Sequence, residues 1–105
     1  MSKKEIIVIT GASRGIGAAI ARRLAGEGKV LYIGYNKQEE AASQVAKECE
    51  ELGAECKTFQ LDITQAEEVT ATFEKIFKTE RSIDVLVNNA AVVRDAPLLG
   101  MEDKD

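Results

Sequence analysis

A glycine-rich turn near the start of the chain carries the residues whose types and spacing point most directly to chemistry. The segment 10–17 reads TGASRGIG and follows the short apolar run 6–9. Glycines at Gly11, Gly15 and Gly17 permit a tight turn and close approach of the backbone to a pyrophosphate. A helix that begins here would offer free N–H groups and the positive end of its dipole to an anion. No Gly-Lys-Ser or Gly-Lys-Thr follows, so the segment is not a P-loop, and a glycine-rich turn without a ligand is the alternative.

Further polar residues follow the later apolar runs. Asn36 and Lys37 come after the second run, Asp62 after the third, and Asn88 and Asn89 after the fourth. In a parallel sheet a ligand lies beyond the carboxyl ends of the strands, where these residues would gather. Each also has a simpler explanation. Lys37 can belong to the solvated face of a helix, Asp62 can be a turn or helix-cap residue, and the asparagines can merely end a strand.

The elements that must position these residues alternate between two periodicities. Short apolar runs predict strands at 5–10, 30–33, 55–61 and 83–87. Helical spacing of apolar residues predicts helices that begin at Gly15, span 37–52 and follow Thr64. This order predicts an α/β fold, a Rossmann-like doubly wound parallel sheet with right-handed crossovers and strand order 3-2-1-4.

Sequence signals also predict how two of these helices are bounded and packed. Gly53 should end the second helix in a left-handed cap. Thr64 and Glu67 have the spacing of a capping box for the third helix. The apolar residues of the second helix are Ala42, Val45, Ala46 and Cys49, and those of the third are Val69, Phe73, Ile76 and Phe77.

Composition narrows the class of protein. The 105 residues carry 18 acidic and 14 basic side chains, a net charge of −4, which argues against generic binding to nucleic acid or an anionic membrane. With 45% hydrophobic and 30% charged residues, the composition is that of a globular domain. No apolar run is long enough to span a bilayer, and no secretory signal is seen.

The absence of histidine from the sequence excludes a His-based triad and most zinc sites. Cys49 and Cys56 are not arranged as a CxxC motif, so both are interpreted as core residues. This cysteine usage predicts a reduced, cytoplasmic protein.

Three motifs in order resemble the short-chain dehydrogenase/reductase family. TGASRGIG resembles its cofactor-binding signature, Asp62 within Leu61-Asp62-Ile63 matches its adenine-site aspartate, and residues 88–91 resemble its Asn-Asn-Ala-Gly motif. The segment 92–101 is similar to that of 3-oxoacyl-[acyl-carrier-protein] reductases. The resemblance covers essentially the whole chain, so residues 1–105 are expected to form the dinucleotide-binding portion. Ala91 departs from the family's usual glycine and could crowd the nicotinamide ribose.

The resemblance implies a role for each matching residue. Asp62 would accept a hydrogen bond from the adenine amino group, and the Ile63 backbone would donate to the ring. Asn88 and Ala90 would lie along the ribose beside the fourth strand. The turn around the pyrophosphate and the adenosine ribose would consist of Gly11, Ser13, Arg14, Gly15, Ile16 and Gly17.

The charges after the second strand favour NADP over NAD. An NAD enzyme places a carboxylate there to bind the ribose 2′-hydroxyl, but the region that begins Gly34-Tyr35-Asn36-Lys37 has no carboxylate before Glu39. Arg14 and Lys37 could instead neutralise a 2′-phosphate, with Asn36 as a further donor.

The family's catalytic residues have no counterpart in this sequence. The family uses a Ser, a Tyr and a Lys one helical turn beyond that Tyr, all downstream of the Asn-Asn-Ala-Gly motif. Tyr32 and Tyr35 precede that motif, and no serine follows Ser82. The chain alone is therefore expected to be inactive. We consider three hypotheses: the amino-terminal portion of an NADP-dependent reductase, a non-catalytic nucleotide-binding or redox-sensing module, and an inactive fold fragment that self-associates.

The fourth strand also predicts self-association. Its run 83–87 is nearly all apolar, with Asp84 the exception, as expected of a strand covered on both faces and paired on both sides. In the order 3-2-1-4 it lies at an edge, and a flat apolar edge invites pairing with another chain. We therefore expect a homo-oligomer that forms through the fourth-strand edge or the exposed helix faces beside it.

Overall fold

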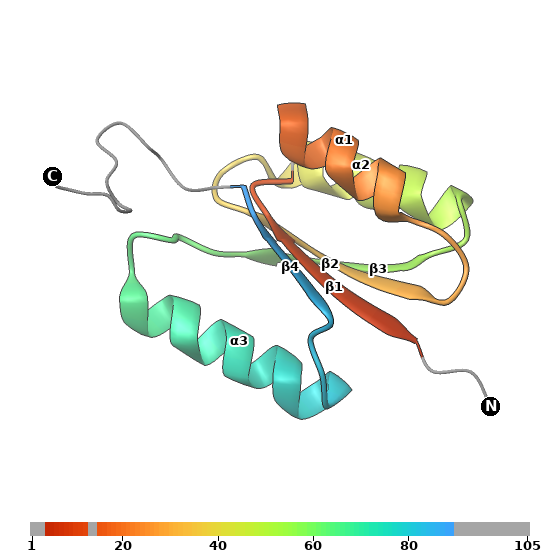
Figure 1. Cartoon of the computed structure of the whole chain (residues 1–105). Coiled ribbons are helices and arrows are strands. Elements are labelled where there is room, and N and C mark those ends of the chain that lie inside the picture. Colours follow the sequence, from red (N-terminus) through yellow and green to blue (C-terminus); the bar gives the residue numbers. More distant parts are fainter. Residues whose placement is uncertain (1–3, 13–14, 90–105) are drawn as a thin grey trace, which may run out of the picture.

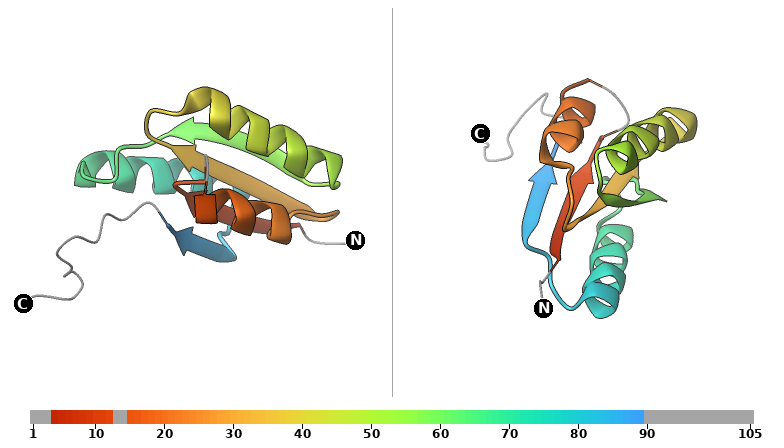
Figure 2. Two further views of the ribbon diagram at one scale, coloured as in Figure 1. Left: turned by 90° about the horizontal axis from the view of Figure 1, so that it is seen from above. Right: turned by 90° about the vertical axis from the view of Figure 1, so that its right-hand side faces the viewer.

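The computed structural model describes residues 4–12 and 15–89 and contains a four-stranded sheet flanked by helices (Figure 1). The elements are β1 (Glu5–Thr10), α1 (Gly15–Leu24), β2 (Lys29–Tyr35), α2 (Glu39–Glu51), β3 (Glu55–Gln60), α3 (Ala66–Glu80) and β4 (Val85–Asn88). All strands are parallel, in the order β3-β2-β1-β4. Helices α1 and α2 cover one face, and α3 lies against the other (Figure 2). The predicted Rossmann-like architecture and strand order are confirmed.

The two central strands are buried on both faces, which explains their continuous apolar runs. Towards α1 and α2, the side chains of Ile7, Ile9 and Leu31 belong to the larger core cluster. Towards α3, Val8 and Tyr32 belong to the smaller cluster. A strand between two helical layers needs apolar residues on both of its faces, and the continuous apolar runs 6–9 and 30–33 that result are the pattern from which β1 and β2 were predicted.

Helix α2 matches its predicted packing. Its four predicted apolar residues are all buried against the sheet. Gly53 has a φ of 106° just beyond the helix, as a left-handed cap requires, and its N–H donates to the Glu50 carbonyl.

The predicted capping box of α3 is wrong. The helix begins at Ala66 after Gln65, and no side chain caps it. Thr64 instead donates from its backbone N–H and from Oγ1 to Oδ1 of Asp62, at 3.0 and 2.6 Å. Asp and Thr side chains often form such local bonds in turns, and here the turn competes successfully with the cap. Of the predicted apolar stripe on α3, only Ile76 is buried.

Tyr32 of β2 connects the C-terminal end of α3 to the sheet. Its hydroxyl donates to Glu80 on α3, and Lys57 of β3 lies 3.5 Å from both the hydroxyl and the Glu80 carboxylate. Burial, followed by the Glu80 carboxylate, raises the pKa of Tyr32. Tyr32 is therefore a neutral phenol that contacts two charged side chains, those of Glu80 and Lys57.

Strand β4 is shorter and less covered than the sequence predicts. It begins at Val85, and directly before it Asp84 accepts the Ile6 N–H at Oδ2 and donates its own N–H to the Ile6 carbonyl. Val85 and Val87 pack against the larger core cluster. Leu86 points to the opposite face and is 53% exposed. Within the part of the chain that the structure describes, the expectation that both faces of β4 are covered is therefore wrong.

Candidate functional site

The glycine turn between β1 and α1 has the backbone that its sequence predicts. Gly11 and Gly15 have φ values of 68° and 66°, in the left-handed region that favours glycine. The Ala12 N–H donates to the Gly34 carbonyl at 3.1 Å, which fixes the turn to the end of β2. A Cβ on Gly17 would lie 2.2 Å from the Gly11 carbonyl oxygen. Gly17 therefore lets the first turn of α1 approach the end of β1 as closely as it does.

The first turn of α1 has a charge pattern that suits an anion. Ile16 is 71% exposed there, and the first turn of the helix contains no acidic residue. The first turn of α1 therefore has no carboxylate that would offset the positive end of the helix dipole. Ser13 and Arg14, both predicted to contribute to this turn, lie outside the described residues.

The carboxyl end of β4 is joined to the glycine turn through Thr10. The Thr10 hydroxyl lies 3.1 Å from Oδ1 of Asn88 and 3.4 Å from the Val87 carbonyl, and it accepts the Asn89 N–H at 3.1 Å. The Asn89 side chain donates from Nδ2 to the Gly11 carbonyl at 3.3 Å. These bonds hold the ends of β1 and β4 together beneath the turn.

Asn89 was not among the cofactor-binding residues predicted from the sequence, although it lies in the same motif as Asn88. Asn89 acts on the carbonyl of Gly11, and its Nδ2 would lie 2.7 Å from a Cβ on Gly17. The side chain of Asn88 takes part in the Thr10 network, and its predicted place along a ribose stays a prediction. Ala90 lies outside the described residues.

The ends of β2 and β3 bring the other predicted residues to the same edge of the sheet. The Leu61 N–H donates to the Tyr35 carbonyl at 2.8 Å, and Nε2 of Gln60 donates to the Asn36 carbonyl at 3.0 Å. Asp62 and Ile63 follow directly in the β3–α3 connection and are partly buried. This connection therefore lies beside the β2–α2 turn that carries Asn36 and Lys37.

Asp62 is held in its charged form. The hydrogen bonds from the Thr64 hydroxyl and backbone keep the pKa of Asp62 below its usual value, and the positive charge of Lys37 acts in the same direction. At neutral pH the Asp62 carboxylate can only accept hydrogen bonds.

Comparison with known proteins agrees with this geometry. Residues 5–105 match the short chain dehydrogenase family. The chain belongs to the short-chain dehydrogenase family. The 3-oxoacyl-[acyl-carrier-protein] reductase FabG of Staphylococcus aureus (strain N315) is 36% identical to it over 105 residues, which are 100% of this chain and 43% of the relative. FabG of Buchnera aphidicola subsp. Baizongia pistaciae is 35% identical over 102 residues, 97% of this chain and 40% of the relative.

Solved structures of short-chain dehydrogenases show the same fold. A metagenomic short-chain oxidoreductase in complex with NADP superposes with a TM-score of 0.79 at 33% identity, over 96% of this chain and 46% of that chain. Acetoin dehydrogenase YohF from Salmonella typhimurium superposes with a TM-score of 0.75 at 30% identity, over 94% of this chain and 41% of that chain. The chain thus spans less than half the length of these short-chain dehydrogenases.

The described part of this short-chain dehydrogenase offers less support for a metal site or a membrane-spanning helix than for a cofactor site. In residues 4–12 and 15–89, the acidic and cysteine side chains form no group of three or more suited to a metal ion, and no helix is long and apolar enough to cross a membrane.

Cys49 is buried and Cys56 is half-buried, both against the larger core cluster, as predicted for core residues. Burial raises the pKa of the Cys56 thiol to about 12, so it is not an activated nucleophile.

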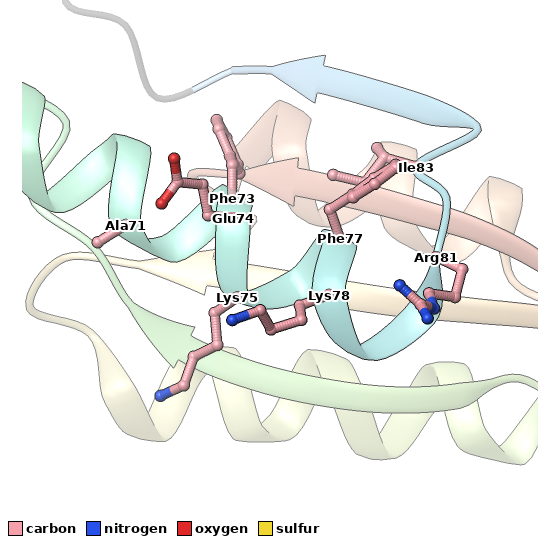
Figure 3. Close-up of a pocket in the computed structure, with 8 residues that line it drawn as sticks. All are labelled: Ala71, Phe73, Glu74, Lys75, Phe77, Lys78, Arg81 and Ile83. Carbon is pink, nitrogen blue, oxygen red and sulfur yellow. The ribbon is translucent and has the colours of Figure 1, made fainter.

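A hollow of about 980 Å³ lies on the other side of the sheet from α1, along α3. It is lined by the apolar side chains of Phe73, Phe77 and Ile83 and by charged side chains that include Lys78 and Arg81 (Figure 3). We call this surface the α3 groove. Its residues come from α3 and from the segment between α3 and β4. None of them belongs to the predicted cofactor site.

Proposed function

We propose that residues 1–105 form the NADP(H)-binding portion of a short-chain dehydrogenase, and that the parent activity is reduction of a 3-oxoacyl thioester by hydride transfer from NADPH. The observation that carries the first part is the approach at Gly17, where no side chain would fit between α1 and the end of β1. The FabG relatives support the second part, since they are 3-oxoacyl-[acyl-carrier-protein] reductases.

The described residues fit a dinucleotide. The start of α1 would offer backbone N–H groups to the pyrophosphate. Asp62, held as a carboxylate, would accept the adenine amino group, while Ile63 would donate to the ring and Asn88 would line the ribose. When bound, NADPH supplies the hydride; the protein's contribution in this portion is to bind and orient it.

NADP is preferred to NAD because of the charges at the end of β2. Lys37 and Asn36 are exposed in the β2–α2 turn, and the nearest carboxylate of the turn is Glu39 at the start of α2. Arg14 would add a second cation from the glycine turn. Two cations, with no carboxylate in the β2–α2 turn before Glu39, suit a 2′-phosphate, and the solved relative in complex with NADP supports this choice.

Calorimetric titration with NADPH and NADH tests the proposal. Arg14→Ala and Lys37→Ala should each lower the ratio of NADPH to NADH affinity by about tenfold, the loss expected for one charge-assisted contact. Arg23→Ala is the matched control, because Arg23 is an exposed cation on α1 that takes no part in the site. An affinity ratio that stays unchanged in Arg14→Ala contradicts the NADP assignment.

The chain should not turn over an acetoacetyl thioester by itself. Hydride transfer in this family needs a Ser, a Tyr and a Lys that no position of this sequence matches. Turnover measured in a preparation shown to be free of longer reductase would contradict this expectation. A non-catalytic nucleotide-binding or redox-sensing module remains the second candidate, and NADPH binding with no reductase activity in any longer form of the protein would favour it.

We further propose a cytoplasmic homo-oligomer that forms through the β4 edge. Among the described residues β4 pairs with β1 alone, and Leu86 of β4 and Phe77 of α3 are each 53% exposed. Light scattering after size exclusion should show a dimer that Leu86→Glu dissociates. Leu52→Glu is the control, since Leu52 is 52% exposed at the end of α2 and lies away from β4. A monodisperse wild-type monomer at high micromolar concentration contradicts this proposal.

A further inference from the structure

One oxygen of the Asp62 carboxylate is already occupied in the folded chain. Oδ1 accepts two hydrogen bonds from Thr64, from the backbone N–H at 3.0 Å and from Oγ1 at 2.6 Å. Oδ2 takes part in neither bond. Two donors on one oxygen fix the rotation of the carboxylate, because turning it would break both bonds at once.

The backbone of Asp62 is fixed as well. Its N–H donates to Oε1 of Glu68 at 3.1 Å, and its carbonyl accepts the Gln65 N–H at 3.0 Å. Glu68 belongs to the first turn of α3, so the position of Asp62 is tied to the helix that follows. Asp62 is therefore held at its backbone by Glu68 and Gln65 and at its side chain by Thr64.

We propose that Thr64 and Glu68 are positioning residues that aim Oδ2 of Asp62 at the adenine amino group and so set a preference for adenine over hypoxanthine dinucleotides. This inference rests on the proposed function. A carboxylate that can only accept hydrogen bonds pairs with the exocyclic amino group of adenine and is repelled by the carbonyl oxygen that replaces it in hypoxanthine. The discrimination requires a fixed carboxylate, since a free one could rotate or move away from the carbonyl.

The test compares the affinities of NADPH and of its reduced hypoxanthine analogue by calorimetry. Wild-type protein should bind NADPH at least about tenfold more tightly, the difference expected for one hydrogen bond to a charged group. Thr64→Val keeps the shape of the side chain but removes the hydroxyl, and should lower this ratio several-fold. Thr64→Ser restores the hydroxyl and should restore the ratio. Glu68→Gln leaves an acceptor in place and should lower the ratio less than Glu68→Ala.

Two controls separate this inference from a general loss of fold and from the proposed function. Thr70→Val alters an exposed threonine of α3 and should leave the ratio unchanged. NMR titration of the Asp62 carboxyl in the absence of cofactor should show a higher pKa in Thr64→Val than in wild type. NADPH binding with the same ratio in wild type and folded Thr64→Val overturns the inference and leaves the proposed function standing. Absence of NADPH binding to the wild type overturns both.

Discussion

Substitution of Gly17 by alanine tests the glycine turn more sharply than any other single change. Intrinsic helix propensity alone predicts that alanine stabilises α1 at this position, by about 1 kcal/mol. The packing predicts the opposite, because the new methyl group would lie 2.2 Å from the Gly11 carbonyl oxygen and 2.7 Å from Nδ2 of Asn89. The sign of the stability change therefore decides between a simple helix and the packed turn.

The steric effect should win. Real Cβ atoms essentially never approach other atoms within 3.0 Å, so the 2.2 Å separation between the Gly11 carbonyl oxygen and the new methyl group must lengthen to at least that distance. Overpacking of this kind costs about 1–3 kcal/mol, and more where backbone atoms must move. The loss exceeds the gain in propensity, and each kcal/mol lowers the melting temperature of a domain this size by roughly 4–8 °C. The displaced carbonyl is the one that Asn89 holds, so the turn should also lose its fit to a pyrophosphate.

Two other glycines provide a graded comparison in thermal unfolding and NADPH titration. Gly26 has no atom within 4 Å of its would-be Cβ and no positive φ, so Gly26→Ala should be neutral or stabilise by about 0.4–1 kcal/mol. Gly15 has open space but a φ of 66°, so Gly15→Ala should cost about 1–2 kcal/mol. Gly17→Ala should combine lower stability with NADPH binding weakened more than tenfold, whereas Gly26→Ala should leave NADPH binding unchanged. Stability and affinity equal to those of Gly26→Ala would refute the packing argument.

Two further predictions concern the sheet. Thr10→Val should lower the free energy of unfolding by about 1–3 kcal/mol, because the Asn89 N–H loses its acceptor. Thr10→Ser keeps the hydroxyl and should lose only about 1 kcal/mol for the missing methyl group; equal losses in urea unfolding would contradict the role of the hydroxyl. Stability should also fall as the pH rises above about 9. The folded chain retains the protons of Cys56, whose pKa is raised to about 12, and of Tyr32, whose pKa is raised by burial, while the unfolded chain releases them. Urea midpoints under reducing conditions that are the same at pH 8 and pH 10.5 would refute this, and Cys56→Ala should flatten the dependence.

The fold could be predicted because its layers impose strong sequence patterns. Strands β1 and β2 are covered on both faces and so are apolar over most of their length, while α2 is buried along one stripe. Strand β4 departed from prediction because its composition did not reveal that Leu86 faces away from the larger core. A short apolar run shows that a strand exists but not which of its faces is covered.

The site was predictable in its location but not in its internal bonds. The carboxyl ends of the strands had to share an edge, so residues as distant as Gly11 and Asp62 could be assigned to one region. The contact of Asn89 with Gly11 joins residues 78 positions apart, and spacing along the chain carries no signal for it. The turn that Asp62 forms with Thr64 displaced the predicted cap, because both features draw on the same threonine.

NADPH titration of isotopically labelled protein, followed by amide NMR, tests the central claim most directly. We predict saturable one-to-one binding with shift changes at the glycine turn of residues 11–17, at Asn36 and Lys37, at Asp62 and Ile63, and at Asn88 and Asn89. The α3 groove around Phe77 should be unaffected. Saturable shifts confined to the α3 groove, or no saturable shift at the carboxyl edge of the sheet, would contradict the assignment of this edge as the cofactor site.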